Sequence, residues 1–175
     1  GHCDSYIQTW VNGLQAFGRP VYLRPFHEFN GNWFPWGIGQ NGNTAADFIA
    51  AWQRLKQMFV PAPNVKFVWC PNIEWNGSSW DGTTFTASFP GTSYVDVLGL
   101  DGYNRPGLQG GTWYTPTQLF NQALTSLQNL GQWPAAYRYV DQNHSLADPA
   151  YQQQLIAARG WVFFPGEAAN VPSTI

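Results

Sequence analysis

Glutamate occurs at only three positions in this chain, and one of them lies among residues suited to acid–base chemistry. Glu28 directly follows His27, lies four residues after Arg24, and is followed by Trp33 and Trp36. Aromatic rings that shield a carboxyl from water favour its protonated form, as a general acid requires, whereas a neighbouring arginine favours the charged form. A protonated carboxyl opposite a charged one is the arrangement that cleaves glycosidic bonds. The segment therefore indicates a candidate general acid for sugar chemistry.

The overall composition also suits a neutral sugar partner. Aromatic residues make up 17% of the chain, with ten Trp, eight Tyr and twelve Phe, and charged residues only 10%. A net charge of −2 argues against nucleic acid, which needs a basic surface. The apolar stretches are too short and interrupted for a membrane span. We expect a polysaccharide or oligosaccharide partner and no contact with nucleic acid or membrane, and the oligomeric state is left open.

Neither a metal nor another cofactor is expected from the sequence. The histidines, His2, His27 and His144, are scattered, and Cys3 and Cys70 lie far apart, so no metal-ligand spacing is present. The two cysteines could form one disulfide in a secreted protein, but two thiols do not define the compartment.

Helix and strand patterns alternate along the chain. Apolar residues at helical spacing predict helices over residues 4–17, 45–59, 117–130 and 149–159. Gly18 is expected to end the first helix, and Asn43 or Thr44 to cap the second. Apolar runs predict strands over residues 20–26, 65–70, 94–100, 135–140 and 161–164.

This alternation predicts an α/β fold with a parallel sheet, in a single domain over residues 1–175. About five strands could form an open, doubly wound sheet or part of a closed barrel. Gly31, Gly37 and Gly39 follow aromatic residues and do not directly open a helix, so the phosphate loop typical of a doubly wound sheet is missing. Polar and aromatic residues instead gather after the strand ends, where barrels carry their catalytic residues. The sequence favours an incomplete (β/α)8 TIM barrel.

Three segments resemble motifs of glycoside hydrolase family 26. Residues 24–37 read RPFHEFNGNWFPWG and closely resemble the family's acid/base motif. Residues 69–72, WCPN, resemble the end of its fifth strand, and residues 89–104, FPGTSYVDVLGLDGYN, its sixth-strand segment. The three segments occur in the family's order with suitable gaps. Family members are mostly β-mannanases, with some β-1,3-1,4-glucanases and β-1,3-xylanases.

The resemblance implies a role for each matching residue. Glu28 would be the acid/base on the fourth strand, with His27 touching the sugar before the cleavage point and Trp33 in the aromatic floor of the cleft. Tyr103 would orient the nucleophile, and Asp101 would support the same network. Two further residues are candidates for the cleft: Trp36 and Asn72.

The resemblance covers roughly residues 4–130 and supplies no glutamate for the nucleophile. The family carries that residue at the end of the seventh strand, where this chain has Tyr139. Asp141 lies two residues further, on the same face of an extended strand, and is the best local substitute. Glu74 and Glu167 are remoter candidates.

The family's first three strands have no counterpart in residues 1–175, so we expect a fragment of the catalytic barrel or a chain that associates to cover its sheet edges. The expected activity is hydrolysis of β-1,4 linkages in mannan-type polysaccharides with retention of configuration. Alternatives are a β-1,3-1,4-glucanase or β-1,3-xylanase on the same scaffold, or an inactive carbohydrate-binding remnant that lacks the nucleophile. Because polymers do not enter cells, we expect an extracellular location.

Overall fold

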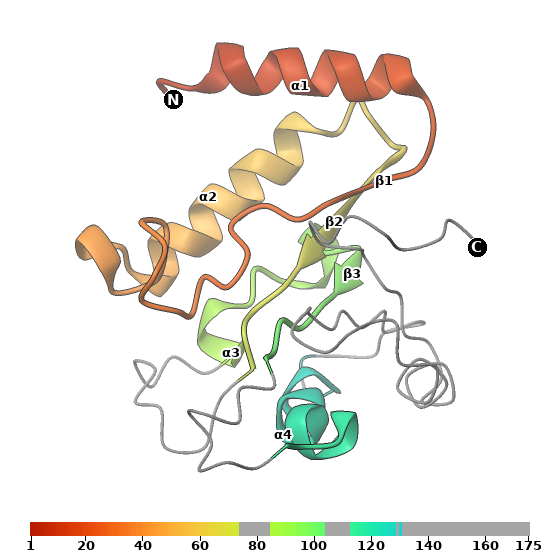
Figure 1. Ribbon diagram of the computed structural model, residues 1–175. Coiled ribbons are helices and arrows are strands. Elements are labelled where there is room, and N and C mark those ends of the chain that lie inside the picture. Colours follow the sequence, from red (N-terminus) through yellow and green to blue (C-terminus); the bar gives the residue numbers. More distant parts are fainter. Residues whose placement is uncertain (74–84, 104–112, 129, 131–175) are drawn as a thin grey trace.

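The computed structural model describes residues 1–73, 85–103, 113–128 and 130, and within them the chain alternates between helices and parallel strands. In chain order the elements are α1 (Asp4–Phe17), β1 (Val21–Leu23), η1 (Gln40–Gly42), α2 (Ala45–Met58), β2 (Val65–Trp69), α3 (Phe85–Ser88), η2 (Thr92–Tyr94), β3 (Val97–Leu98) and α4 (Pro116–Gln128). The described strands form one sheet in the order β1-β2-β3, with both pairings parallel. Figure 1 shows α1 and α2 packed together on one side of the strands, with α4 at the far end of the molecule. The predicted α/β class with a parallel sheet is confirmed.

The first two helices begin and end close to the predicted positions. Gly18 ends α1 in the left-handed conformation, φ 69°, and its N–H donates to the Leu14 carbonyl. Thr44, rather than Asn43, caps α2. Its hydroxyl accepts from the Asp47 N–H, while the Asp47 carboxylate accepts from the Thr44 N–H, so each residue satisfies a backbone donor of the other.

The strand predicted over residues 20–26 is shorter than expected. Only Val21–Leu23 pair with β2, because the chain leaves the sheet at Arg24 and enters a series of turns. Phe26 and Glu28 there have φ values of 51° and 52°, a left-handed conformation that no strand residue adopts. The prediction for residues 65–70 was close: β2 is buried at every position except Lys66.

The strand predicted over residues 94–100 is also shorter than expected. Residues 92–94 form the turn η2, and only Val97 and Leu98 are assigned to β3. Backbone bonds nevertheless continue the alignment on both sides, from Asp96 N–H to the Phe67 carbonyl (3.0 Å) and from Gly99 N–H to the Trp69 carbonyl (2.8 Å). The parallel arrangement therefore reaches the residues that follow β2 and β3.

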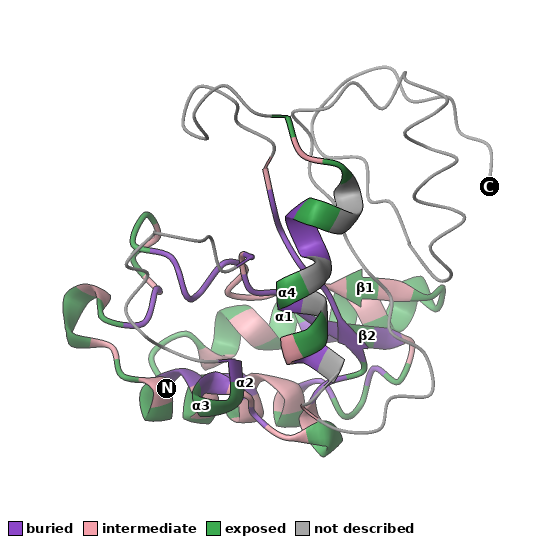
Figure 2. Ribbon diagram, turned by 90° about the horizontal axis from the view of Figure 1, so that it is seen from below, coloured by how far each residue is buried: buried purple, intermediate pink, exposed green. Residues whose placement is uncertain are grey.

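A largely aromatic core lies between the sheet and its helices. Phe67 of β2 contacts Trp52 of α2 and Phe59 edge-on, with ring centroids 5.8 and 5.3 Å apart. Phe29 stacks on Phe48 at 4.2 Å and so ties the loop after β1 to the same core. Figure 2 shows β2 mostly buried, whereas α1 remains largely exposed. The core thereby fixes the loop that carries Glu28.

Other predictions concern cysteine pairing, the C-terminal elements and membrane contact. Cys3 is exposed and Cys70 is buried, and both are free thiols, so the possible disulfide between them is not formed. The elements predicted over residues 135–140, 149–159 and 161–164 lie outside the described residues. Within the described part of the chain, no helix has the length and apolar content needed to cross a membrane.

Candidate active site

Glu28 lies at the carboxyl end of the sheet, beside the residues that follow β2. Its backbone N–H donates to the Cys70 carbonyl (2.8 Å), so the chain returns to the sheet edge after the turn that follows β1. The residue as a whole is 3% exposed. A buried carboxyl in the left-handed conformation costs free energy on both counts, and such strain is typical of functional sites.

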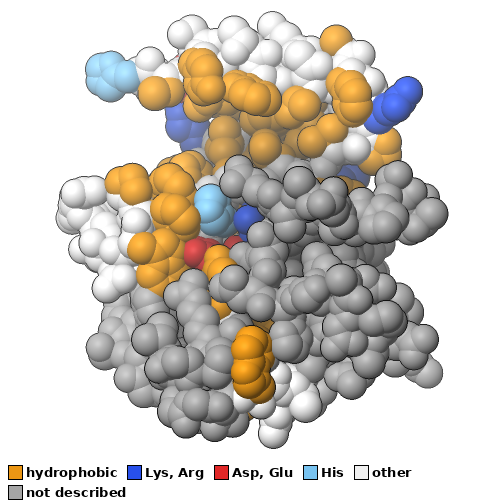
Figure 3. Space-filling view, viewed as in Figure 1, with side chains coloured by type: hydrophobic (Ala, Val, Ile, Leu, Met, Phe, Trp, Pro, Cys, Tyr) orange, Lys and Arg blue, Asp and Glu red, His pale blue; other side chains and the backbone are white. Residues whose placement is uncertain are grey.

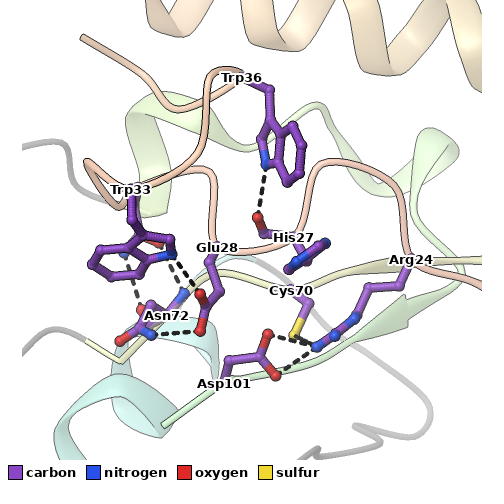
Figure 4. A network of polar contacts seen from close by, with 9 residues as sticks. Arg24, His27, Glu28, Trp33, Trp36, Cys70, Asn72 and Asp101 are labelled. Carbon is purple, nitrogen blue, oxygen red and sulfur yellow. Dashed lines mark hydrogen bonds and ion pairs between the residues drawn. The ribbon is translucent and has the colours of Figure 1, made fainter. Parts of the chain in front are cut away.

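Two side-chain donors hold the Glu28 carboxyl (Figure 4). Trp33 Nε1 donates to Oε2 at 2.6 Å, and Asn72 Nδ2 donates to Oε1 at 2.8 Å. A carboxylate has about four acceptor sites, so these bonds leave acceptor capacity on the group. The described residues do not pair Glu28 with a cation. Among the described residues, uncharged donors thus orient the carboxyl.

The Trp33 ring reaches Glu28 because Gly31 has no side chain. A Cβ at Gly31 would lie 2.4 Å from the Trp33 ring, far below van der Waals contact. Trp33 is 40% exposed. It therefore contacts the buried carboxyl with its Nε1 and also presents its ring to the solvent. An exposed flat ring beside a buried carboxyl is suited to stacking on a sugar.

Asn30 fastens the Glu28 loop to Asn72. Its Nδ2 donates to the Asn72 carbonyl (3.0 Å), and its Oδ1 accepts from the Asn72 N–H (2.8 Å). The side chain therefore bonds both polar groups of one peptide residue, as a neighbouring strand would. Asn30 was not predicted as a site residue. The sequence gives only a weak indication of this contact: Asn30 lies two residues after Glu28, and Asn72 lies two residues after Cys70.

Asp101 and Arg24 form a second polar group below Glu28. Arg24 Nη1 donates to both carboxylate oxygens of Asp101, at 2.6 and 2.5 Å, and lies 3.7 Å from Cys70 Sγ. Asp101 is 2% exposed, and this ion pair offsets part of the cost of burying its charge. Arg24 was expected to favour the charged form of Glu28, but its guanidinium is bonded to Asp101. Burial raises the pKa of the Cys70 thiol well above its ordinary value, with Asp101 adding to the rise, so the thiol stays protonated.

His27 lies on the other side of Glu28, in a cluster of rings. Its imidazole contacts Phe34 at 4.7 Å and Trp36 at 5.3 Å, and the Phe34 and Trp36 rings stack at 4.4 Å. Trp36 Nε1 donates to the His27 carbonyl (2.9 Å), which fixes the indole to the backbone. Burial, and secondarily the Arg24 charge, lower the pKa of His27. The imidazole is therefore neutral at pH 7.

The structure brings most of the predicted site residues to one place. Glu28, Trp33 and Asn72 are in direct contact, and His27 and Trp36 adjoin them. Asp101 pairs with Asn72 across the sheet, and Tyr103, half-buried, follows two residues later. Three predicted carboxyls lie outside the described residues: Glu74, Asp141 and Glu167.

The surface over this site combines charged and apolar groups. Figure 3 shows acidic, basic and imidazole side chains meeting in a recess beside a band of hydrophobic ones. The described residues contain no group of three or more His, Cys, Asp or Glu able to hold a metal ion. What the arrangement offers is an oriented carboxyl and a neutral imidazole, which are groups able to transfer protons, beside an exposed indole ring.

Comparison with known proteins places this arrangement in a family. Residues 3–147 match the model of glycosyl hydrolase family 26. The chain belongs to that family. The resemblance in the three sequence motifs is thereby confirmed.

Individual relatives match over parts of their length. Endoglucanase H of Acetivibrio thermocellus is 36% identical over 138 residues, which are 75% of this chain and 15% of that protein. The mannan endo-1,4-beta-mannosidase of Bacillus subtilis strain 168 is 33% identical over 101 residues, 57% of this chain and 27% of that protein. Among solved structures, a family 26 beta-mannanase from Bacteroides ovatus has a TM-score of 0.60 at 21% identity, covering 93% of this chain and 50% of that one. The structural match thus covers about half of a family 26 barrel domain.

Proposed function

We propose that this chain carries the acid/base part of a retaining glycoside hydrolase that cleaves β-1,4 linkages in mannan-type polysaccharides. The observation that carries the proposal is the Glu28 carboxyl, 3% exposed and hydrogen-bonded to a tryptophan that is 40% exposed. The buried acid supplies the proton, and the exposed ring supplies a surface for the sugar next to it. The named B. subtilis mannosidase supports the choice of linkage.

Glu28 has two tasks in this mechanism. In the first step it protonates the glycosidic oxygen while a second carboxylate attacks the anomeric carbon, so the C–O bond breaks and a glycosyl-enzyme forms. In the second step Glu28, now charged, takes a proton from water, whose oxygen displaces the enzyme carboxylate and restores the original configuration. Asp141 is our candidate for the second carboxylate, ahead of Glu167 and Glu74.

The other site residues would act on binding. We assign His27 and Trp33 to the sugar adjoining the cleavage point, Trp36 to the cleft wall beside them, and Tyr103 to orienting the nucleophile. Asp101, bonded to Arg24, would support Tyr103 through the backbone that follows β3. The scaffold would be part of a (β/α)8 barrel whose first three strands are not among these residues, in a protein that acts outside the cell.

An acid/base role predicts a specific chemical defect in Glu28→Ala. An aryl β-mannobioside with a 2,4-dinitrophenyl leaving group needs no protonation, so the variant should keep most of the first-step rate on it while losing about 100- to 10,000-fold on mannohexaose. Added azide, which needs no general base, should restore turnover and give the β-mannosyl azide. Equal loss on both substrates without azide rescue would contradict the assignment.

A second function is supported by the relative called Endoglucanase H, at 36% identity over 138 residues. It would be cleavage of a β-glucan on the same scaffold, with β-1,3-xylan as a third possible polymer. Reducing sugar released from linear mannan, lichenan, carboxymethyl cellulose and β-1,3-xylan would separate these activities. If the wild-type chain binds mannohexaose in calorimetry yet releases no sugar from any of the four, it is a carbohydrate-binding remnant and the catalytic proposal fails for this chain.

A further inference from the structure

Glu28 lies in a stretch of backbone that belongs to no helix or strand. Residues 24–39 form turns and bends between β1 and η1, and Glu28 itself has a φ of 52°. A glutamate has three side-chain torsions, and a general acid must be held within a few tenths of an ångström of its target. The orientation of the carboxyl must therefore come from contacts with other segments.

Asn72 supplies one of these contacts from the end of β2. Its Nδ2 donates to Glu28 Oε1 at 2.8 Å, whereas the partner of Oε2, Trp33, belongs to the same loop as Glu28. Of these two hydrogen bonds to the carboxyl, the one from Asn72 ties it to the sheet. A loop movement would carry Glu28 and Trp33 together, but not Asn72.

The backbone of Asn72 is itself fixed from two sides. Asn30 bonds both its N–H and its carbonyl, and on the opposite side it pairs in parallel with Asp101, where Ile73 N–H donates to the Asp101 carbonyl (2.7 Å). Asn30 is 4% exposed, so its two bonds form away from competing water. The backbone that carries the amide donor to Glu28 is therefore anchored by hydrogen bonds on both sides.

Resting on the proposed acid/base role of Glu28, we propose that Asn72 is a positioning residue for that carboxyl and that Asn30 holds Asn72 in place. Asn72 also separates two carboxylates. Glu28 lies on its side-chain amide and Asp101 pairs with its backbone, while Arg24 balances the Asp101 charge. An uncharged donor at residue 72 orients Glu28 without a salt bridge to the group that must release a proton.

The kinetic test compares substrates with poor and good leaving groups. Asn72→Ala should lower kcat on mannohexaose by about 10- to 100-fold with KM within about twofold, because a misplaced acid slows proton transfer and not binding. The 2,4-dinitrophenyl mannobioside should be affected much less. Asn30→Ala should show the same pattern with a smaller loss. In Glu28→Ala, adding Asn72→Ala should cause no further loss on mannohexaose, since Asn72 acts through Glu28.

A second measurement does not depend on turnover. In ¹⁵N-labelled protein, solvent exchange of the Trp33 indole N–H should be about tenfold faster in Asn72→Ala, because a carboxyl freed on one side holds its other donor less tightly. Asn12→Ala, which changes an amide on the exposed face of α1, should leave that exchange unchanged. Unchanged exchange in Asn72→Ala, or equal kinetic loss on both substrates, would overturn the positioning role. If Glu28→Ala loses activity equally on mannohexaose and on the 2,4-dinitrophenyl mannobioside, the proposed function is refuted. The exchange rate of the Trp33 indole N–H would still show whether Asn72 positions the Glu28 carboxyl.

Discussion

At the residue scale, the two buried carboxylates of the site are stabilised in different ways. Asp101 has the guanidinium of Arg24 as its partner, with Nη1 donating to both carboxylate oxygens, which stabilises the charged form. Glu28 has one indole and one amide donor, which orient it without an opposite charge. A group that alternates between proton donor and acceptor is better served by the second arrangement, because a salt bridge would hold it in the charged form. The site thus separates an ion-paired carboxylate, Asp101, from a carboxyl held by uncharged donors, Glu28.

His27 should make the protein sensitive to mild acid. Its pKa is lowered by burial and then by Arg24, so the unfolded chain binds the proton near pH 6.5 and the folded chain only at lower pH. The stability from this residue is therefore complete above about pH 6.5 and is lost as the pH falls through the folded-state pKa. Urea midpoints at pH 8 and pH 5 should differ more for the wild type than for His27→Gln, which does not titrate.

The comparison is made within each protein, because His27→Gln also removes ring contacts with Phe34 and Trp36. Asp4 and Asp47 also have lowered pKa values, through hydrogen bonds with the N-terminus and Thr44 respectively, but they protonate below about 3.8 and act in a more acid window. The same change of midpoint in the wild type and the variant would show that His27 does not cause the loss.

At the element scale, the sequence predicts well the helices and strands whose positions depend on residues close together in the chain. The helix over residues 4–17 follows from its apolar spacing and Gly18, and β2 from a run of buried residues. The strand predicted over residues 20–26 is too long because the apolar run continues past Arg24, where the chain turns to bring Glu28 beside Cys70. The Asn30–Asn72 pair joins residues 42 positions apart, so no local pattern could reveal it.

The start of α2 provides a test at this scale. The Thr44 hydroxyl accepts from the Asp47 N–H, and that orphan donor loses its partner in Thr44→Ala. The variant should lose about 1 kcal/mol of unfolding free energy, measured by urea denaturation. Thr9→Ala in the middle of α1, where the hydroxyl bonds the Tyr6 carbonyl of its own helix, is the matched control and should change stability by less than about 0.5 kcal/mol. Equal losses in the two variants would contradict a capping role.

At the scale of the whole molecule, the loop that carries Glu28 packs on the larger of two buried clusters among the described residues. Phe29, next to Glu28, stacks on Phe48 of α2 and lies 5.0 Å from the Trp69 ring of β2, so the loop that carries Glu28 and the sheet share aromatic partners. The chain matches about half of a family 26 barrel, and its larger buried cluster draws residues from α1, α2, β2, β3 and α4. Loosening the core should therefore disturb the site without touching a polar residue.

Phe67 lies near the centre of that core and has an exposed neighbour on the same strand for comparison. Its ring contacts Trp52 and Phe59 and is fully buried, whereas Lys66 points to the solvent. Phe67→Ala should lower the unfolding free energy by about 3–5 kcal/mol through lost burial and a residual cavity, and Lys66→Ala by less than about 0.5 kcal/mol. The Trp33 indole exchange should also quicken in the folded Phe67→Ala protein, because the loosened core no longer holds the Glu28 loop firmly. If stability falls while that exchange stays at the wild-type rate, the hydrogen bonds of Asn72 hold the Glu28 carboxyl without help from the core. The core would then support the fold but not the position of Glu28.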